Sequence, residues 1–341
     1  RWFISYSART AIPGSKGNIV KQFPIARELV LAGGGHSHVI FLRMLAMQPI
    51  PGLKVTLISP EAVTPYSGML PGLVAGHYDR DDVYIDLVPL CQFAGVDFIR
   101  GQVFSLDPVE QTVEIFGRPS LRYDLLSIDV GSTPSSGKLD GKSIIPVKPI
   151  SLFLDHWQRF AEASSNGEIH DLVFVGSGAG GVELCLAVQH FLSKQCLPAL
   201  PRIHLVTEGS TLLKEFPKTV QRTFERLLLD REVVIHKGFR ASEHRAGLLC
   251  AEDGRELDAD AVFRITQAEA QDWFRTAGLA VDPDGFILVR DTLQTHSFDN
   301  VFAVGDCATM ANFSRPKAGV FAVRQGEPLY KNIRGFLYKE T

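Results

Sequence analysis

The sequence predicts an α/β protein built from two domains of the same kind, the second inserted in the first. A strand, a glycine-rich turn, a helix and a further strand occur in this order twice, with Gly33 and Gly176 at the two turns. A candidate antiparallel β-meander follows each copy. The duplication predicts two Rossmann-like, three-layer ββα dinucleotide-binding domains, and 341 residues are enough for both.

The first domain is expected over residues 28–148 and 295–341. It begins with a strand over 28–32, a helix over 39–47 and a buried strand over 53–59. Short strands are then expected to form an antiparallel meander that returns to the sheet, over 96–100, 102–106, 112–116 and 125–130. A last strand over 301–304 and a helix that starts near Ala318 complete this domain.

The second domain is expected over residues 149–294. Its predicted helices and strands are a helix over 149–163, a strand over 171–175, a helix over 182–194 and a strand over 202–207. A second meander is expected over 244–265.

The composition excludes several classes of function. The net charge of −3 gives no electrostatic case for binding nucleic acid, and no stretch of about 20 mostly apolar residues predicts a membrane span. The five cysteines are scattered, which argues against a redox dithiol and a zinc ribbon and predicts no metal site. Scattered cysteines favour a reducing, cytoplasmic compartment. Peripheral membrane contact and import into an organelle stay open.

Residues 1–27 form a basic segment without acidic residues, which we exclude from the fold. Such a segment is typical of a transit-peptide remnant, an expression artefact or a disordered tail.

The first glycine turn predicts a site for a dinucleotide. Gly33 allows the tight turn, and Gly35 lets the backbone approach a pyrophosphate at the N-terminus of the next helix. His38 stands where the fingerprint has a third glycine, so we expect it to pack against the strand or to contact the dinucleotide. Ser59 stands where an acidic residue usually binds the adenosine ribose, and a hydroxyl is a weaker, neutral partner there.

The second turn fits the fingerprint fully, with Gly176, Gly178 and Gly181. Glu208 ends the next strand, and a carboxylate there accepts the 2′-hydroxyl of NADH and repels the 2′-phosphate of NADPH. We therefore expect NADH to be preferred, although a solvated acid at a strand end explains Glu208 as well. Near the end of the chain, a strand leads into Gly305 and Asp306, which are expected to admit a cofactor and to accept a hydrogen bond from a ribityl hydroxyl.

Together these residues resemble the flavoproteins with two dinucleotide-binding domains, the pyridine nucleotide-disulfide oxidoreductase superfamily. The stretches 64–72 and 315–326 are similar, more specifically, to the type II NADH dehydrogenase-like module associated with selenophosphate synthetase (selenide, water dikinase). The resemblance spans about residues 28–340. It implies hydride transfer from NADH to N5 of FAD and onward transfer to a small-molecule acceptor such as a quinone.

The resemblance also implies which residues form the FAD site. Val103 meets the adenine through its backbone, Pro65 and Tyr66 lie beside the isoalloxazine, and the helix near Ala318 points its N-terminus at the flavin. Lys317 adds to this effect and is a candidate catalytic residue. The complete predicted FAD set is Gly33, Gly35, His36, Ser37, His38, Ser59, Pro65, Tyr66, Val103, Gly131, Gly305, Asp306, Ala318 and Gly319.

The implied NADH site adds residues to the second turn. Glu183 is placed near the nicotinamide–flavin contact and is the second candidate catalytic residue, although an acid favoured by the helix dipole explains it equally. Thr266 and Gln267 belong to a loop over the nicotinamide. The complete predicted set is Gly176, Gly178, Gly181, Glu183, Glu208, Thr266 and Gln267.

Departures from the superfamily keep two alternatives open. Val320 and Arg324 replace glutamines that line the quinone site of type II NADH dehydrogenases, which weakens the quinone assignment. One alternative is a sulfur- or selenium-linked flavoenzyme like the sulfide:quinone reductases, with Cys185 or Cys307 as the reactive thiol. The other is a non-catalytic flavin-binding module in selenophosphate synthesis. Selenophosphate synthetase and a second copy of the chain are the candidate protein partners.

Overall fold

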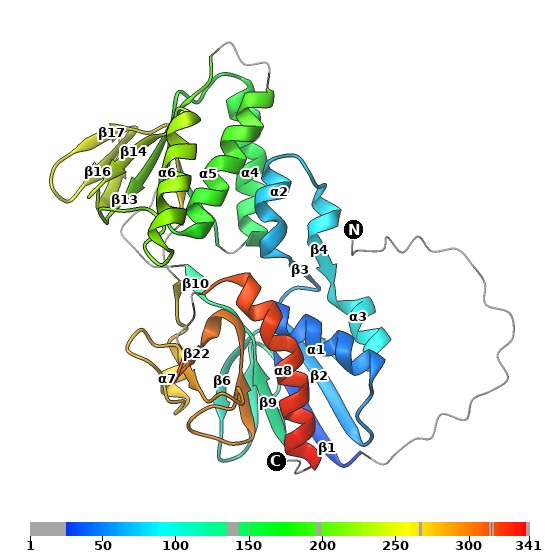
Figure 1. The fold of residues 1–341 in the computed structure, drawn as a ribbon. Coiled ribbons are helices and arrows are strands. Elements are labelled where there is room, and N and C mark those ends of the chain that lie inside the picture. The colour runs from blue at the N-terminus through cyan, green and yellow to red at the C-terminus, as the bar shows by residue number, and fades with distance from the viewer. Residues whose placement is uncertain are drawn as a thin grey trace, which may run out of the picture.

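Figure 1 shows the computed structural model as two lobes, one above the other. The structure describes residues 25–134, 143–148, 150–195, 199–265, 268–313, 315 and 317–338. Residues 1–24 of the predicted tail lie outside this part. Arg27 is the first residue of strand β1, so the tail that we predicted to end at residue 27 ends earlier.

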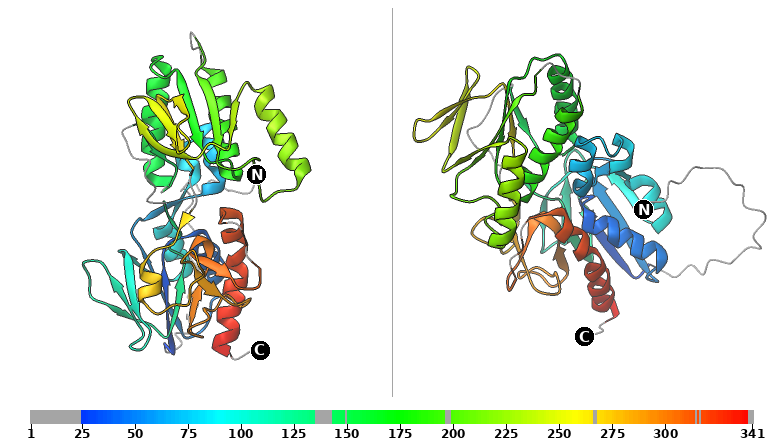
Figure 2. Two further views of the ribbon diagram at one scale, coloured as in Figure 1. Left: turned by 90° about the vertical axis from the view of Figure 1, so that its left-hand side faces the viewer. Right: turned by 45° about the horizontal axis from the view of Figure 1, so that its top comes forward.

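The lower lobe contains a parallel sheet of five strands in the order β21-β9-β1-β2-β5. These strands are β1 (Arg27–Ala32), β2 (Leu53–Ser59), β5 (Asp97–Arg100), β9 (Leu125–Ile128) and β21 (Val301–Ala303). Helices α1 (His36–Met47), α3 (Leu87–Ala94) and α8 (Gly319–Tyr338) pack together, and the antiparallel meander consists of β6 (Val103–Asp107), β7 (Thr112–Ile115) and β8 (Leu121–Arg122). In the left view of Figure 2 this meander (teal) and α8 (red) lie on opposite sides of the sheet, which gives three layers.

The upper lobe repeats this plan with the strand order β11-β18-β12-β13-β14, again all parallel. The strands are β11 (Ile144–Pro146), β12 (Asp171–Val175), β13 (Arg202–Thr207), β14 (Val234–Lys237) and β18 (Ala261–Arg264). One face packs against α4 (Ile150–Ser165), α5 (Ala179–Lys194) and α6 (Lys218–Asp230). The other face packs against the meander β15 (Ala241–Arg245), β16 (Leu248–Ala251) and β17 (Glu256–Asp258).

Both predicted meanders need correction. Residues 97–100 and 125–128, which we assigned to the first meander, are strands of the parallel sheet, where β5 pairs with β2 and β9 with β1. The same holds for β18, which lies inside the predicted meander 244–265 but pairs with β12 in the sheet. Periodicity within a short strand does not say which partner it pairs with, because the partner lies far away in the sequence.

The structure also contains shorter elements that were not predicted. They are β3 (Val63–Pro65), the 3-10 helix η1 (Ser67–Met69), α2 (Leu70–Val74), η2 (Arg80–Val83), β4 (Tyr84–Asp86), β10 (Thr133–Pro134), β19 (Ala268–Glu269), α7 (Trp273–Thr276), β20 (Ile287–Val289), η3 (Gly305–Cys307) and β22 (Ala308–Met310).

Each lobe also receives a segment from the part of the sequence that we assigned to the other. Leu70 and Val74 of α2 lie in the upper core, where α2 packs on α5. Conversely, Phe274 and Ile287 lie in the lower core, and β20 pairs with β22. The packing of the two cores therefore does not follow the predicted domain boundaries at residues 148 and 294. Whether these boundaries separate two folding units stays a prediction.

Candidate functional site

The carboxyl ends of the two parallel sheets face each other where the lobes meet. Strand β10 follows β9 of the lower sheet, and β19 follows β18 of the upper sheet. These two short strands pair with each other, Thr133 opposite Glu269. Because ligands of open α/β sheets bind outside the carboxyl ends of the strands, this region is the expected place for both dinucleotides.

At two glycines of the first turn, a Cβ would clash with Asp129. Gly33 has a φ of +97°, and a Cβ there would lie 2.3 Å from the backbone oxygen of Asp129. Gly35 is the N-cap of α1 and provides no side-chain cap. A Cβ on Gly35 would lie 2.3 Å from the carboxyl oxygen Oδ1 of Asp129.

His38 packs behind this turn, which was one of the two roles that we expected for it. Its side chain is fully buried, with Nδ1 2.6 Å from the carbonyl oxygen of Gly33 and Nε2 2.8 Å from Oγ of Ser127. Burial lowers the pKa of His38 to about 4, so the ring is neutral at physiological pH. The imidazole therefore ties the turn to β9.

Ser37 and His36 connect the start of α1 to two other elements of the predicted FAD site. The Ser37 hydroxyl is buried and donates to the carbonyl oxygen of Ala322 in α8 at 2.7 Å. The His36 ring lies against the Tyr66 ring, with centroids 5.2 Å apart, and its Nε2 accepts a hydrogen bond from the amide of Ser67. Burial lowers the pKa of His36, and the nearby Asp306 opposes this effect.

The N-terminus of α8 reaches the same region. A Cβ on Gly319 would lie 2.4 Å from Oγ of Ser67, so α8 packs closely on η1 at this glycine. The helix follows Ala318, as predicted, and Pro65 and Tyr66 immediately precede η1. The structure thus brings together the predicted FAD residues of α1, Pro65 and Tyr66, and the predicted residues at the start of α8.

Gly305 and Asp306 lie at the end of β21 beside α8. Gly305 has a φ of +70°, and its amide donates to Oε1 of Gln325 at 2.7 Å. The Asp306 carboxylate forms an ion pair of 2.9 Å with Lys148, which also donates to Ser132. We did not predict Lys148, because a lysine after a short strand carries no sequence signal of its own.

Lys317 lies near Asp306, but its ammonium group already has partners within the protein. Its ammonium group is 4.1 Å from the centre of the Phe286 ring and donates to Oγ1 of Thr309 at 2.8 Å and to the carbonyl oxygen of Ala308. Burial lowers the pKa of Lys317. Lys317 lines a small cleft together with Gly305, Asp306, Ala318, Phe321 and Gln325. A catalytic role for Lys317 stays a prediction.

Three other predicted FAD residues lie at strand ends in the lower lobe. Ser59 is the last residue of β2, is buried, and has its Oγ 3.0 Å from the position that a Cβ on Gly34 would take. Val103 is buried and is the first residue of β6. Gly131 follows β9, has a φ of +68°, and has open space where its Cβ would be.

Asp129 lies beside the predicted FAD residues and was not predicted itself. It follows β9 directly, its side chain is buried, and its Oδ2 accepts a hydrogen bond from the amide of His38 at 3.1 Å. Burial raises the pKa of Asp129 to about 7. An aspartate within the mostly apolar run 125–130 was the available sequence signal.

The second turn follows the fingerprint in structure as in sequence. A Cβ on Gly176 would lie 2.2 Å from the carbonyl oxygen of Ile265, and one on Gly181 would lie 1.9 Å from the carbonyl oxygen of Gly176. The first glycine therefore serves the turn and the third serves the packing of helix on strand. Gly178 is the N-cap of α5 and has open space where its Cβ would be, as the approach of a pyrophosphate requires.

Glu208 follows β13 at the same edge of the sheet. Its side chain is exposed, and Oε1 lies 3.4 Å from Nε of Arg240. Arg240 also contacts Glu252 and precedes β15. We did not predict Arg240, because its proximity to Glu208 depends on the parallel pairing of β13 with β14.

Glu183 lies on the first turns of α5 and lines a groove between α2, α5 and α6. Pro71, Gly72, Leu186 and His190 also line this groove. Burial raises the pKa of Glu183. Thr266 and Gln267 lie outside the residues that the structure describes, so the nicotinamide end of the site stays a prediction.

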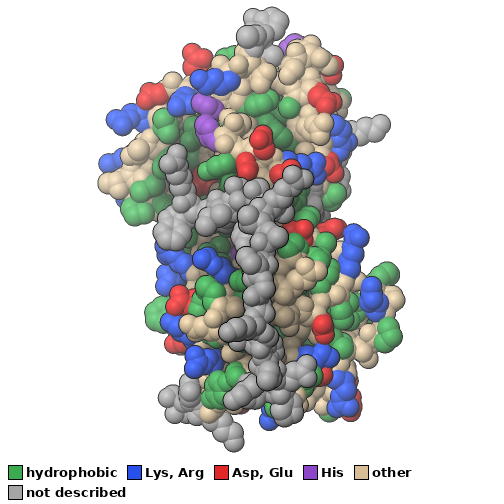
Figure 3. Space-filling model, turned by 90° about the vertical axis from the view of Figure 1, so that its right-hand side faces the viewer, with side chains coloured by type: hydrophobic (Ala, Val, Ile, Leu, Met, Phe, Trp, Pro, Cys, Tyr) green, Lys and Arg blue, Asp and Glu red, His purple; other side chains and the backbone are tan. Residues whose placement is uncertain are grey.

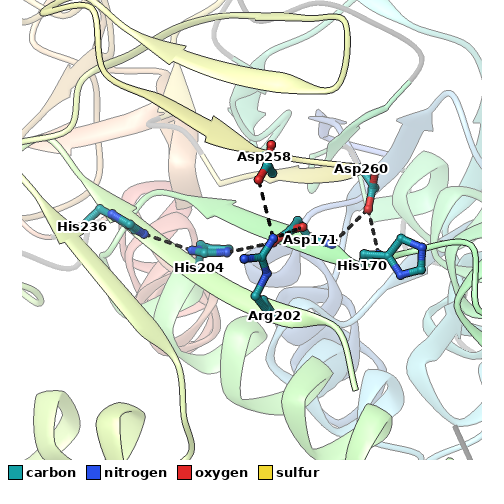
Figure 4. A network of polar contacts seen from close by, with 7 residues as sticks. All are labelled: His170, Asp171, Arg202, His204, His236, Asp258 and Asp260. Carbon is teal, nitrogen blue, oxygen red and sulfur yellow. Dashed lines mark hydrogen bonds and ion pairs between the residues drawn. The ribbon is translucent and has the colours of Figure 1, made fainter. Parts of the chain in front are cut away.

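A second polar cluster lies at the opposite edge of the upper sheet (Figure 4). Asp171, the first residue of β12, accepts hydrogen bonds from Arg202 at 2.7 Å and from His204 at 3.2 Å. His204 is also 3.0 Å from His236 on β14. Because this is the amino end of β12 and the glycine turn is at its carboxyl end, the cluster joins strands and lies away from the predicted dinucleotide site.

The described residues contain no group of three or more His, Cys, Asp or Glu side chains arranged to hold a metal ion. Among the helices of the described part, none is long and apolar enough to cross a membrane. On the face shown in Figure 3, basic and acidic side chains are interspersed where the surface is not covered by grey atoms.

The comparisons with known proteins agree with this geometry. The family described as pyridine nucleotide-disulphide oxidoreductase matches residues 27–326. The type II NADH:quinone oxidoreductase of Haemophilus influenzae is 22% identical over 332 residues, which cover 83% of this chain and 74% of that protein. Ferroptosis suppressor protein 1 of Taeniopygia guttata is 25% identical over 249 residues, which cover 70% of this chain but only 63% of that relative.

A solved structure confirms the predicted fold class. The sulfide:quinone oxidoreductase of Aquifex aeolicus superposes with a TM-score of 0.79 at 19% identity, covering 92% of this chain and 78% of that one. At this identity the likeness concerns the fold alone.

Proposed function

The chain belongs to the pyridine nucleotide-disulphide oxidoreductase family, and from this premise we propose that it oxidises NADH with a bound FAD and passes the electrons to a small-molecule acceptor. One observation carries the proposal: two glycine turns, at Gly33 and Gly176, lie at the carboxyl ends of two parallel sheets whose ends meet through β10 and β19. Two dinucleotides bound there would have their reactive ends between the lobes.

The residues of the lower lobe fit FAD. In the described part of the chain, the amide of His36 at the start of α1 has no hydrogen-bond acceptor, so it is free for a phosphate oxygen. Asp306 presents a carboxylate beside this turn for a ribityl hydroxyl, with Lys148 as its present partner. Gly131 leaves open space at the end of β9.

FAD, when bound, supplies the electron-accepting ring system. The task of the chain is to position two rings and to exclude water, and no acid or base is needed for a hydride step. The Tyr66–His36 pair would border the ring system, and the α8 N-terminus at Gly319 would favour negative charge on it. Glu183 and Lys317 remain the candidates for a direct role.

Steady-state turnover tests the proposal against a non-catalytic flavin-binding module. The FAD-loaded protein should oxidise NADH continuously with a quinone or a dye as acceptor, and the apoprotein should not. Binding of FAD without turnover, with any of a panel of acceptors, would favour the non-catalytic module.

Glu208 supports a preference for NADH over NADPH, and Arg240 modifies this expectation. An isolated carboxylate would repel a 2′-phosphate, but a guanidinium 3.4 Å away offers that phosphate a partner. We propose that NADH is preferred and that Arg240 leaves NADPH a usable substrate.

The sulfur- or selenium-linked alternative lacks an accessible thiol among the two candidate cysteines. Cys185 and Cys307 are fully buried. Burial raises the pKa of Cys185, and it raises that of Cys307 to about 12, so neither is a ready thiolate. Other points stay predictions: the identity of the acceptor, an association with selenophosphate synthetase, a homodimer, contact with a membrane surface and a cytoplasmic location.

A further inference from the structure

The carboxyl group of Asp129 lies at the centre of the proposed FAD site, although the proposed function does not use it. Its side chain is buried at the end of β9. A Cβ on Gly35 would lie 2.3 Å from Oδ1 of Asp129, and a Cβ on Gly305 would lie 2.4 Å from the same atom. The two glycines of the proposed site therefore leave space that this carboxyl group fills.

The same carboxyl group occupies part of the N-terminus of α1. The first amides of a helix have no partner within the helix. Oδ2 of Asp129 accepts a hydrogen bond from the amide of His38, the third residue of α1, and the nearby amide of Ser37, the second residue, also lowers the pKa of this carboxyl group. The amide of His36, the first residue, has no acceptor in the described part of the chain. A phosphate bound to that amide would share one helix end with Asp129.

We propose that Asp129 is a positioning residue that must be neutral when a pyrophosphate occupies the N-terminus of α1, so that FAD binding takes up a proton at this carboxyl group. The inference rests on the proposed function only in that FAD is the ligand, and it does not depend on NADH oxidation. Two anions at one buried helix end repel each other strongly, because little water screens them. Protonation of Asp129 removes this repulsion and still leaves a carbonyl oxygen for an amide hydrogen bond.

His36, His38 and Cys307, which lie around Asp129, do not change charge in the range above neutrality. On α1, burial lowers the pKa of His36, and it lowers that of His38 to about 4, so both rings are neutral above neutral pH. On η3, Asp306 is paired with Lys148, and burial raises the pKa of Cys307 to about 12.

Asp129 itself titrates near neutrality, because burial raises its pKa to about 7. A bound pyrophosphate raises this pKa further. In the range above neutrality the carboxyl group is then ionised in the free protein and protonated in the complex, so affinity for FAD must fall as the pH rises.

The dissociation constant of FAD, measured on the apoprotein between about pH 6 and pH 9, tests the inference. For the wild type it should be constant below neutrality and then rise by up to about tenfold per pH unit. Asp129→Asn keeps an oxygen for the amides but cannot ionise. The dissociation constant of FAD for this variant should therefore not change with pH, and at alkaline pH it should be lower than that of the wild type. Asp124→Asn is the matched control: Asp124 precedes β9 at its other end, bonds the amide of Glu28 and should keep the wild-type slope.

Calorimetry of the wild type with FAD, in two buffers of different ionisation enthalpy, decides the matter even if Asp129→Asn fails to fold. Net proton uptake at about pH 8 is the expected result. FAD binding without proton uptake, or equal pH slopes in the wild type and Asp129→Asn, would overturn the inference and leave the proposed function intact. Absence of FAD binding at every pH would contradict both.

Discussion

At the scale of single residues, the glycines of the second turn show how strictly local geometry selects an amino acid. Gly181 and Gly180 are neighbours on the first turn of α5, yet a Cβ on Gly181 would lie 1.9 Å from a backbone oxygen, whereas one on Gly180 would meet only the Ile265 side chain at 3.9 Å. The fingerprint G-x-G-x-x-G records this difference, which is why it could be read from the sequence.

We expect Gly181→Ala to lower the free energy of unfolding by about 1–3 kcal/mol, because the backbone of Gly176 or α5 must shift. Urea unfolding of the purified protein measures this change. Gly180→Ala is the matched control and should be neutral or stabilising by up to about 1 kcal/mol, since alanine favours a helix. Equal losses in both variants would mean that the turn is less tightly packed than the structure indicates.

The pair of Glu208 and Arg240 gives a second prediction at this scale. Glu208→Gln should lower the ratio of kcat/KM for NADH to that for NADPH by about tenfold, which corresponds to about 1.4 kcal/mol. Arg240→Gln should raise the ratio, because a 2′-phosphate loses its partner. Ratios unchanged in both variants would place the adenosine ribose elsewhere.

Sequence analysis could not identify the residues whose role depends on a contact with a residue far away in the sequence. Asp129 meets α1, Lys148 meets Asp306 and Arg240 meets Glu208, each across many residues of sequence. Gly33, Gly35, Gly305, Pro65 and Tyr66 could be proposed from the sequence because their type or motif is itself the signal. His38 was flagged as irregular, and its packing role became clear only with Ser127 beside it.

At the scale of elements, strands with a continuous apolar run were predicted well and strand partners were not. The bounds of β12 and β13 agree with the predicted strands 171–175 and 202–207. The strands β5, β9 and β18 were assigned to meanders although they complete the parallel sheets. Short amphipathic runs leave pairing open, and tertiary packing decides it.

The contact between α1 and α8 gives a prediction for an element. Ser37→Ala removes the buried hydrogen bond from its hydroxyl to Ala322, and we expect a loss of about 1–2 kcal/mol in unfolding free energy. Ser165→Ala is the control, because its hydroxyl bonds within α4 at an exposed position, and a change below about 0.5 kcal/mol is expected. Thermal or urea unfolding compares the two, and equal effects would contradict a special role for the α1–α8 contact.

At the scale of the whole molecule, the two lobes are interlocked and not simply joined in series. Helix α2 packs in the upper core, residues 274–293 pack in the lower core, and β10 pairs with β19 between them. This arrangement holds the carboxyl ends of both sheets together, which is what transfer between two bound dinucleotides requires. The duplication in the sequence predicted two sites, but only the structure shows that their strand ends meet.

Reduction of bound FAD by NADH under anaerobic conditions tests the central claim most directly. The yellow absorbance of the FAD-loaded protein should bleach on addition of one equivalent of NADH, and Gly180→Ala should behave as the wild type does. A protein that binds FAD tightly and stays yellow with an excess of both NADH and NADPH would contradict the account.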